Sequence, residues 1–187
     1  LTPEDKTPEE ELQEDIAMQP SVPEDLKIPE GLKNDGKAHL GGTGEMYQYT
    51  DSSGREWLFK PSRAKYSGEL EPFRAYIQEA GYKVQSIVDP DSAVPVATGT
   101  IDGKFGALQK KVKVGNMTPD LNDWYYNGGE LSSSIKEQLQ RENVTDWLLA
   151  NYDSHAGNFI YSEKGTIIGV DKEQSFRYLQ KKGAQKM

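Results

Sequence analysis

The chain has 187 residues, a formal net charge of −8 and no cysteine, with 35% hydrophobic and 28% charged residues. This length fits one domain with or without a tail, and the lack of cysteine excludes disulfides, thiolate catalysis and cysteine metal sites. No apolar run approaches the ~20 residues that a membrane span needs, so we expect a soluble protein, although the absence of cysteine does not separate a cytoplasmic protein from an exported effector.

Residues 1–35 form an acidic, proline-rich leader. They contain eleven acidic residues against three lysines, together with five of the ten prolines, whereas the rest of the chain has nineteen acids and nineteen bases. Such a composition resists packing. We therefore expect residues 1–35 to be mobile or to lie on a surface, and residues 36–187 to form the domain. The neutral domain gives no electrostatic case for binding nucleic acid.

Short strand-like runs separated by turn residues begin near residue 37. There are three of them, at residues 38–40, 46–50 and 56–60. A cluster of small residues follows the first run: Gly41, Gly42, Thr43 and Gly44. Glycine amides can approach a phosphate closely, and Lys60 at the end of the third run could reach it. The alternative is an ordinary hairpin with a solvent-facing lysine, which a glycine cluster alone favours.

Residues 69–88 are the first expected helix. Apolar side chains recur there at the spacing of one helix face: Phe73, Ile77, Ala80, Val84 and Ile87. Glu79 lies beside that face. We expect Glu79 to form an ion pair with Lys60 in an active arrangement, within about 4 Å. The alternative for Glu79 is a surface carboxylate on a solvated flank.

Two more strands are expected at residues 94–101 and 104–112, because an Asp-Gly turn joins them. With the earlier runs they give five strands with one helix inserted after the third. Residues 113–131 form a connector whose aromatic residues cover a core edge or line a groove: Trp124, Tyr125 and Tyr126.

A second helix is expected at residues 132–150. Ser134 and Glu137 fit a capping box at its start. Four residues supply its apolar face, and Asn143 marks a point where the helix could break. The four residues are Ile135, Leu139, Trp147 and Leu148.

The residues best suited to chemistry follow this helix. Asp153, His155 and Asn158 lie on a short loop, and Asp171 ends a β-branched run after a short hairpin at residues 158–170. The loop and the end of the hairpin would bring two carboxylates and an amide close together. Their oxygens are the hard ligands that hold Mg²⁺ on phosphate oxygens. The sequence therefore favours phosphoryl transfer.

The order of these parts resembles the protein-kinase-like fold. The loop at residues 153–158 reads Asp-x-His-x-x-Asn, and an aspartate follows one hairpin later. Both are similar to the atypical branch that includes phosphatidylinositol 3/4-kinases, HipA-like kinases and actin-fragmin kinase. The resemblance spans about residues 37–178. It implies an α+β two-lobe fold, with a small antiparallel β N-lobe carrying one helix at about 37–113 and a reduced helical C-lobe at about 114–187.

The resemblance also implies an ATP- and Mg²⁺-dependent kinase. The nucleotide phosphates would be bound by Gly41, Gly42, Thr43, Gly44 and Lys60. Glu79 would orient the lysine, and Asp153 would accept the proton of the incoming hydroxyl. Asn158 and Asp171 would hold Mg²⁺, while His155 would be structural or face a phosphate.

Two features depart from the kinase pattern. Residues 41–44 lack the Gly-x-Gly-x-x-Gly spacing. The kinase pattern therefore does not establish how this loop would bind ATP. Residues 171–173 read Asp-Lys-Glu in place of Asp-Phe-Gly, which argues against switching by a conventional activation loop. Few residues follow Asp171, so we expect a minimal kinase or a fragment of one.

The expected acceptor is a serine or threonine hydroxyl of a protein. Aminoglycoside and choline kinases share the Asp-x-His-x-Gly-Asn pattern, but they usually place His-Gly before the aspartate, where this chain has Asn151 and Tyr152. A small-molecule or lipid kinase, a nucleotide-binding pseudokinase or interaction module, and an enzyme that transfers AMP remain alternatives. The expected partners are thus a nucleotide and a protein substrate.

Overall fold

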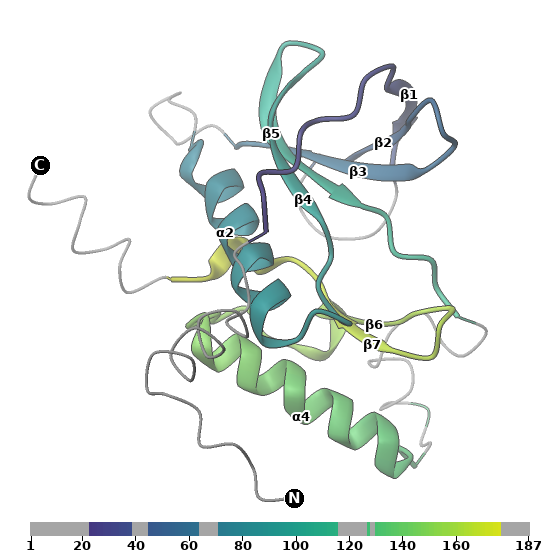
Figure 1. Cartoon of the computed structure of the whole chain (residues 1–187), viewed down its shortest axis with the longest axis vertical. Coiled ribbons are helices and arrows are strands. Elements are labelled where there is room, and N and C mark those ends of the chain that lie inside the picture. The colour runs from purple at the N-terminus through teal and green to yellow at the C-terminus, as the bar shows by residue number, and fades with distance from the viewer. Residues whose placement is uncertain (1–22, 39–44, 64–70, 116–126, 128–129, 177–187) are drawn as a thin grey trace, which may run out of the picture.

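The structure is a computed structural model that describes residues 23–38, 45–63, 71–115, 127 and 130–176. A five-stranded antiparallel sheet in the order β1-β2-β3-β5-β4 forms one part, and helix α4 with a two-stranded sheet forms the other (Figure 1). The sheet strands are β1 (Lys33–Lys37), β2 (Tyr47–Thr50), β3 (Glu56–Pro61), β4 (Val96–Ile101) and β5 (Lys104–Lys110). The helices and the hairpin strands are α2 (Phe73–Val88), α4 (Ser133–Leu148), β6 (Phe159–Tyr161) and β7 (Ile167–Gly169). The described residues also contain two 3₁₀ turns, η1 (Ala156–Asn158) and η2 (Lys172–Gln174).

This architecture confirms an α+β fold with five antiparallel strands and one helix after the third. The hairpin that was expected before Asp171 is also present, with Phe159 paired to Gly169 and Tyr161 to Ile167. The aromatic connector residues 124–126 lie outside the described residues.

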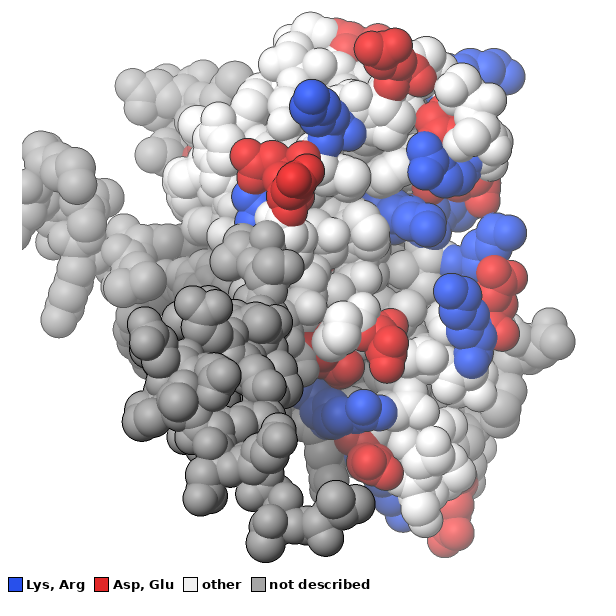
Figure 2. All heavy atoms as spheres, in the orientation of Figure 1, with Lys and Arg blue, Asp and Glu red and all other residues white. Residues whose placement is uncertain are grey.

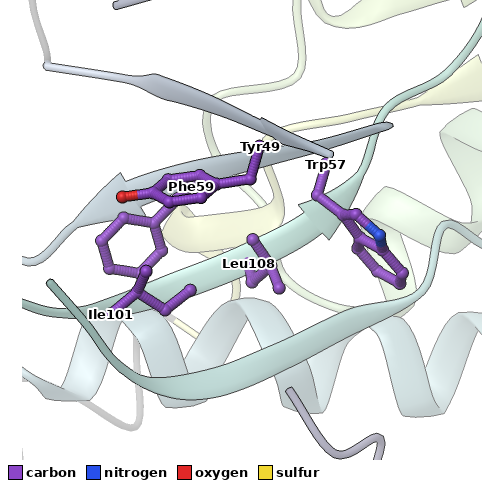
Figure 3. Close-up of a cluster of buried hydrophobic side chains, with 5 residues drawn as sticks. All are labelled: Tyr49, Trp57, Phe59, Ile101 and Leu108. Carbon is purple, nitrogen blue, oxygen red and sulfur yellow. The ribbon is translucent and has the colours of Figure 1, made fainter. Parts of the chain in front are cut away.

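The core of the sheet lies on one of its faces. It is a cluster of large side chains contributed by four strands: Tyr49, Trp57, Phe59, Ile101 and Leu108 (Figure 3). Because side chains alternate along a strand, Lys60 points to the opposite face from Phe59. Ala107, the cross-strand partner of Lys60, packs there with Ala75 of α2. The strand alternation therefore places the lysine on the face that α2 covers.

The first strand differs from the expected one at residues 38–40. It is β1, whose five residues are all exposed and which carries a bulge between Asn34 and Gly36. A polar edge strand of this kind has no apolar alternation, which is why the sequence pattern missed it. Gly41, Gly42, Thr43 and Gly44 lie outside the described residues, in the connection from β1 to β2.

Part of the acidic leader packs on the sheet. Leu26, Ile28 and Leu32 are half-buried against the core cluster, and Asp25 forms an ion pair with Lys83 of α2. Residues 23–32 therefore lie on a surface of the domain, and the expected boundary at residue 35 falls inside β1. Residues 1–22 lie outside the described residues.

Two leader deletions should separate these segments. Removing residues 1–22 is expected to leave the melting temperature nearly unchanged, because their acidic composition favours solvation. Removing residues 1–32 should lower it by roughly 10 °C, because three half-buried apolar side chains are lost. Thermal unfolding followed by circular dichroism checks both. Equal melting temperatures for the two deletions would show that the leader adds nothing to the stability of the domain.

Helix α2 buries a different face from the one predicted by its apolar residues. Its buried residues are small or carry amides: Ala75, Gln78, Gly81 and Gln85. A Cβ at Gly81 would lie 3.1 Å from Cβ of Lys172, so η2 sits directly against this face. Phe73, placed on the buried face by the sequence, is 37% exposed. The close approach of η2 selects for small side chains, and this outweighs the apolar pattern.

Helix α4 also differs from its prediction. It runs unbroken through residue 143. Its N-cap is Ser132 and not the predicted Ser134, and the Ser132 side chain accepts a hydrogen bond from the amide of Ile135. Its buried face holds Glu142 and Asp146, whereas Trp147 of the predicted apolar face is 78% exposed. The cause is a buried lysine, described below with the site.

The surface carries charges of both signs. On the face shown in Figure 2, basic and acidic side chains of the described residues are interspersed, and neither sign forms a continuous field. This pattern agrees with the neutral composition of the domain. Within the described ranges, no helix combines the length and the apolar character that crossing a bilayer requires.

Candidate active site

Lys60 is the point where the two parts of the chain meet. Its Nζ lies 3.0 and 3.1 Å from the two carboxylate oxygens of Asp171, and 3.0 Å from Oε2 of Glu173 in η2. The Lys60 side chain is only 14% exposed. Two residues separated by 111 positions in the sequence, both singled out by their motifs, are therefore in direct contact.

Asp171 is positioned by the β6–β7 hairpin. The amide of Val170 donates to the carbonyl of Asn158 at 2.8 Å, so Asn158 and Asp171 stand at the same end of the hairpin. Asp171 itself adopts the left-handed conformation, with φ 60° and ψ 54°. Few residues other than glycine take this conformation, although aspartate and asparagine take it more readily than most. This backbone turn starts η2 immediately after the carboxylate.

The loop from Asn151 to Asn158 is held by its own side chains. Asn151 donates through Nδ2 to Oδ1 of Asp146 at 3.0 Å, and its Oδ1 accepts from the amide of Asp153 at 3.3 Å. Asn158 donates through Nδ2 to the carbonyl of Asp153 at 2.7 Å. With the amide nitrogen of Asn158 engaged, its Oδ1 is the atom suited to a cation. The Asp153 side chain is 48% exposed, so it is accessible from solvent.

The His155 ring contacts the loop on both sides of its own position, at Asp153 and at Gly157. Its Nδ1 accepts a hydrogen bond from the amide of Gly157 at 3.1 Å, and its Nε2 lies 4.0 Å from Oδ1 of Asp153. A neutral imidazole that accepts at Nδ1 carries its proton on Nε2, on the side of Asp153. The ring therefore lies beside the Asp153 carboxylate and is bonded to the backbone of the same loop, and its structural or phosphate-facing role stays a prediction.

A buried ionic network anchors the turn behind Asp171. Nζ of Lys172 lies 3.2 Å from Oε2 of Glu142 and 2.7 Å from Oδ1 of Asp146, and all three side chains are almost fully buried. Gln85 of α2 donates to the same Glu142 carboxylate. A Cβ at Gly169 would lie 2.3 Å from Oε2 of Glu142, so a larger residue there would displace the ion pair between Glu142 and Lys172. The network ties η2, α2 and α4 together around Asp171.

Replacing Lys172 with methionine should destabilise the fold by about 3–5 kcal/mol, because Glu142 and Asp146 would stay buried without a cation. Urea unfolding measures this loss. A matched variant that also carries Glu142→Gln and Asp146→Asn removes all three charges, and it is expected to recover much of the stability. A loss below about 1 kcal/mol for Lys172→Met alone would show that the carboxylates do not depend on the lysine.

The expected ion pair between Lys60 and Glu79 is not among the contacts of the described residues. Glu79 pairs instead with Lys83 at 3.3 Å. The reason is the rotation of α2, since Gln78 faces the sheet and Glu79, the next residue, points about 100° away. Gln78 donates to Gln109 at 2.8 Å, and it lines a small cavity beside Lys60.

Glu173 is the site residue that the sequence analysis missed. It was read only as part of the Asp-Lys-Glu departure from the kinase pattern. The available signal was a run of three charged residues, Asp171 to Glu173, shortly after the last strand. Lys172 was missed as well, because its partners in α4 are 26 and 30 residues earlier.

The donors at the hairpin end fit a magnesium ion delivered with a phosphate. Asp171 supplies a carboxylate and Asn158 an amide oxygen. Among the described residues, no group of three or more His, Cys, Asp or Glu side chains is arranged to hold a metal. Mg²⁺ usually takes one or two protein carboxylates and completes its octahedron with phosphate oxygens and water. The sparse protein donor set therefore suits Mg²⁺ bound together with a nucleotide.

Comparisons with known proteins give the fold. No protein-family model matches the sequence, and no curated protein matches it. Among solved structures, the chain is similar to the Helicobacter pylori proinflammatory kinase CtkA, with a TM-score of 0.57 and 15% sequence identity. The similarity covers 78% of this chain and 58% of that kinase, so the chain spans less than two thirds of the kinase's length. The five-stranded sheet with α2, and the second part with α4 and the β6–β7 hairpin, thus form a kinase-like two-lobe fold.

Proposed function

We propose that this chain is an ATP- and Mg²⁺-dependent phosphotransferase that passes the γ-phosphate to a serine or threonine hydroxyl of a protein. The contact between Lys60 and Asp171, at 3.0 Å, carries the proposal. Kinases place a strand lysine on the nucleotide phosphates and an aspartate on the metal. In this chain the strand lysine and the hairpin aspartate meet at one point between the two parts of the fold.

Each residue has a distinct task in this proposal. Lys60 binds phosphate oxygens, together with the backbone amides of Gly41, Gly42, Thr43 and Gly44, whose small side chains would let a phosphate come close. Asp171 and Asn158 provide the oxygen ligands for Mg²⁺. The bound ion would neutralise charge that develops on the transferred phosphate. Asp153 accepts the proton of the attacking hydroxyl.

The subtype proposed is the atypical kinase branch. Its loop pattern, Asp-x-His-x-x-Asn, is met at residues 153–158. His155 stands 4.0 Å from Asp153 and bonds the backbone of the same loop, which supports a role in fixing the aspartate. A solved structure to which this chain is similar is also described as a kinase.

A protein acceptor is favoured by the open surroundings of Asp153. Its side chain is about half exposed, and the neighbouring Tyr152 is also exposed. Tyr152 stands directly before Asp153, where small-molecule kinases of similar pattern usually carry glycine. An accessible carboxylate beside an exposed ring can receive a hydroxyl from an extended polypeptide.

Isotope transfer tests the proposal. The 187-residue chain is incubated with Mg²⁺, a mixture of protein acceptors, and ATP labelled on either the γ- or the α-phosphate. We expect protein-bound label only from γ-labelled ATP and only with Mg²⁺ present. Label from α-labelled ATP would indicate AMP transfer. Labelling confined to aminoglycosides, choline or inositol lipids added in parallel would overturn the protein acceptor, and ATP binding without any transfer would indicate a pseudokinase.

A further inference from the structure

Glu173 is a second ion-pair partner of Lys60, beside Asp171. Its Oε2 lies 3.0 Å from Nζ of Lys60, and its Oε1 lies 3.5 Å from Nη1 of Arg74 in α2. The Glu173 side chain is only 11% exposed. Each carboxylate oxygen therefore has its own cation. This arrangement fixes the orientation of the carboxylate as well as its position.

The turn that carries Glu173 is rigidly held from two sides. Lys172, the preceding residue, is buried and forms ion pairs with two carboxylates of α4. Its Cβ packs against Gly81 of α2. Arg74 is held in turn by Glu71 at 2.8 Å. Glu173 is thus presented to Lys60 by the same turn that presents Asp171.

Lys60 needs a partner that stays when the metal binds. Under the proposed function, Asp171 gives its carboxylate to Mg²⁺, so its attraction for the lysine is shared with a divalent cation. In kinases a glutamate from the N-lobe helix then holds the strand lysine on the phosphates. The α2 residues that line the small cavity beside Lys60 are Arg74, Ala75 and Gln78, and none of them carries a carboxylate.

We propose that Glu173 is the positioning carboxylate of Lys60, the role that the sequence analysis gave to Glu79. This inference rests on the proposed function and deepens it. The lysine, its positioning glutamate and the metal aspartate then depend on one turn, η2. Because Glu173 also pairs with Arg74 of α2 and η2 packs on Gly81, the positioning of Lys60 stays coupled to α2.

The test compares Glu173→Gln with Glu79→Gln as its matched control. Glu173→Gln is expected to lower kcat/KM for ATP roughly 10- to 100-fold, the range for removing an outer partner of a site residue. It should also weaken ATP binding while leaving adenosine binding unchanged, since under the proposed function Lys60 binds the phosphates and not the nucleoside. A merely structural role would weaken both ligands together. Glu79→Gln should change neither, and Glu173→Asp should recover part of the loss.

A second variant covers loss of folding. Glu173→Gln combined with Arg74→Gln removes one charge of each sign, so the net charge of the cluster is kept. We expect this double variant to fold and to show the same selective loss of ATP binding. Glu173 variants that match Glu79→Gln in both ATP binding and kcat/KM would overturn the inference while leaving the kinase proposal intact. An unsubstituted chain that binds no ATP would overturn the proposed function and this role with it.

Discussion

Replacing Asp171 with asparagine is expected to reduce phosphoryl transfer by at least about 1000-fold, the scale of losing a preorganised charged group at a transferring phosphate. Asparagine keeps the shape of the side chain and accepts the left-handed backbone that Asp171 adopts. The fold should therefore survive the change. Alanine should abolish transfer equally, with a small added cost from its less favourable backbone conformation. Steady-state turnover of Mg-ATP measures the effect, and thermal unfolding verifies the fold.

The matched control for Asp171 is Glu163→Ala, which removes an exposed carboxylate from the turn of the same hairpin. This variant should keep normal turnover. Near-normal transfer by Asp171→Asn and Asp171→Ala would show that Asp171 only caps η2 and does not hold the metal.

Replacing Asp153 with alanine is expected to lower kcat by about 10²- to 10⁴-fold, the usual contribution of a general base. Nucleotide affinity should remain, because positioning the hydroxyl contributes to the transition state more than to ATP binding. The Asp153 carboxylate is half exposed, and among the described residues the one ion pair it forms is with His155 at 4.0 Å, and only if that ring is protonated. Its loss should therefore leave the fold unchanged. Single-turnover kinetics and equilibrium ATP binding separate the two effects.

Ser154→Ala is the matched control for Asp153, since it changes the exposed neighbouring residue of the loop. It should affect neither kcat nor ATP binding. If Asp153→Ala lost ATP affinity and kcat to the same extent, Asp153 would belong to the nucleotide site and not to the acceptor side.

Local patterns predicted the sheet well. The alternation that buries Trp57 and Phe59, and the Asp-Gly turn between β4 and β5, depend on residues close together in the sequence. The edge strand β1 was shifted because an exposed polar strand leaves no apolar pattern. Leu26 and Ile28 were assigned to a mobile or surface leader because composition over 35 residues hides a few apolar contacts.

The buried faces of both helices required tertiary information. Helix α4 turns Glu142 and Asp146 inward because Lys172, far away in the sequence, supplies their positive charge. Helix α2 turns Gly81 and Gln78 inward because η2 and the sheet approach it closely. In both cases apolar periodicity predicted the existence of the helix but not its orientation.

Only part of the candidate site could be predicted, because some of its contacts also depend on tertiary structure. Sequence motifs identified Lys60 and Asp171, which the fold brings into contact. They could not identify Glu173, because its contact with Lys60 joins residues far apart in the sequence. Similarity to a family motif locates only the residues that belong to the motif. A residue that contacts the site from another element is found only from the structure.

Intact-mass analysis after incubation with Mg-ATP and a protein acceptor tests phosphoryl transfer most directly. The unsubstituted chain should add the mass of one or more phosphate groups to the acceptor or to itself, and Asp171→Asn should add none. A gain equal to AMP on either protein, or a phosphate gain that Asp171→Asn retains in full, would contradict a kinase centred on Lys60 and Asp171.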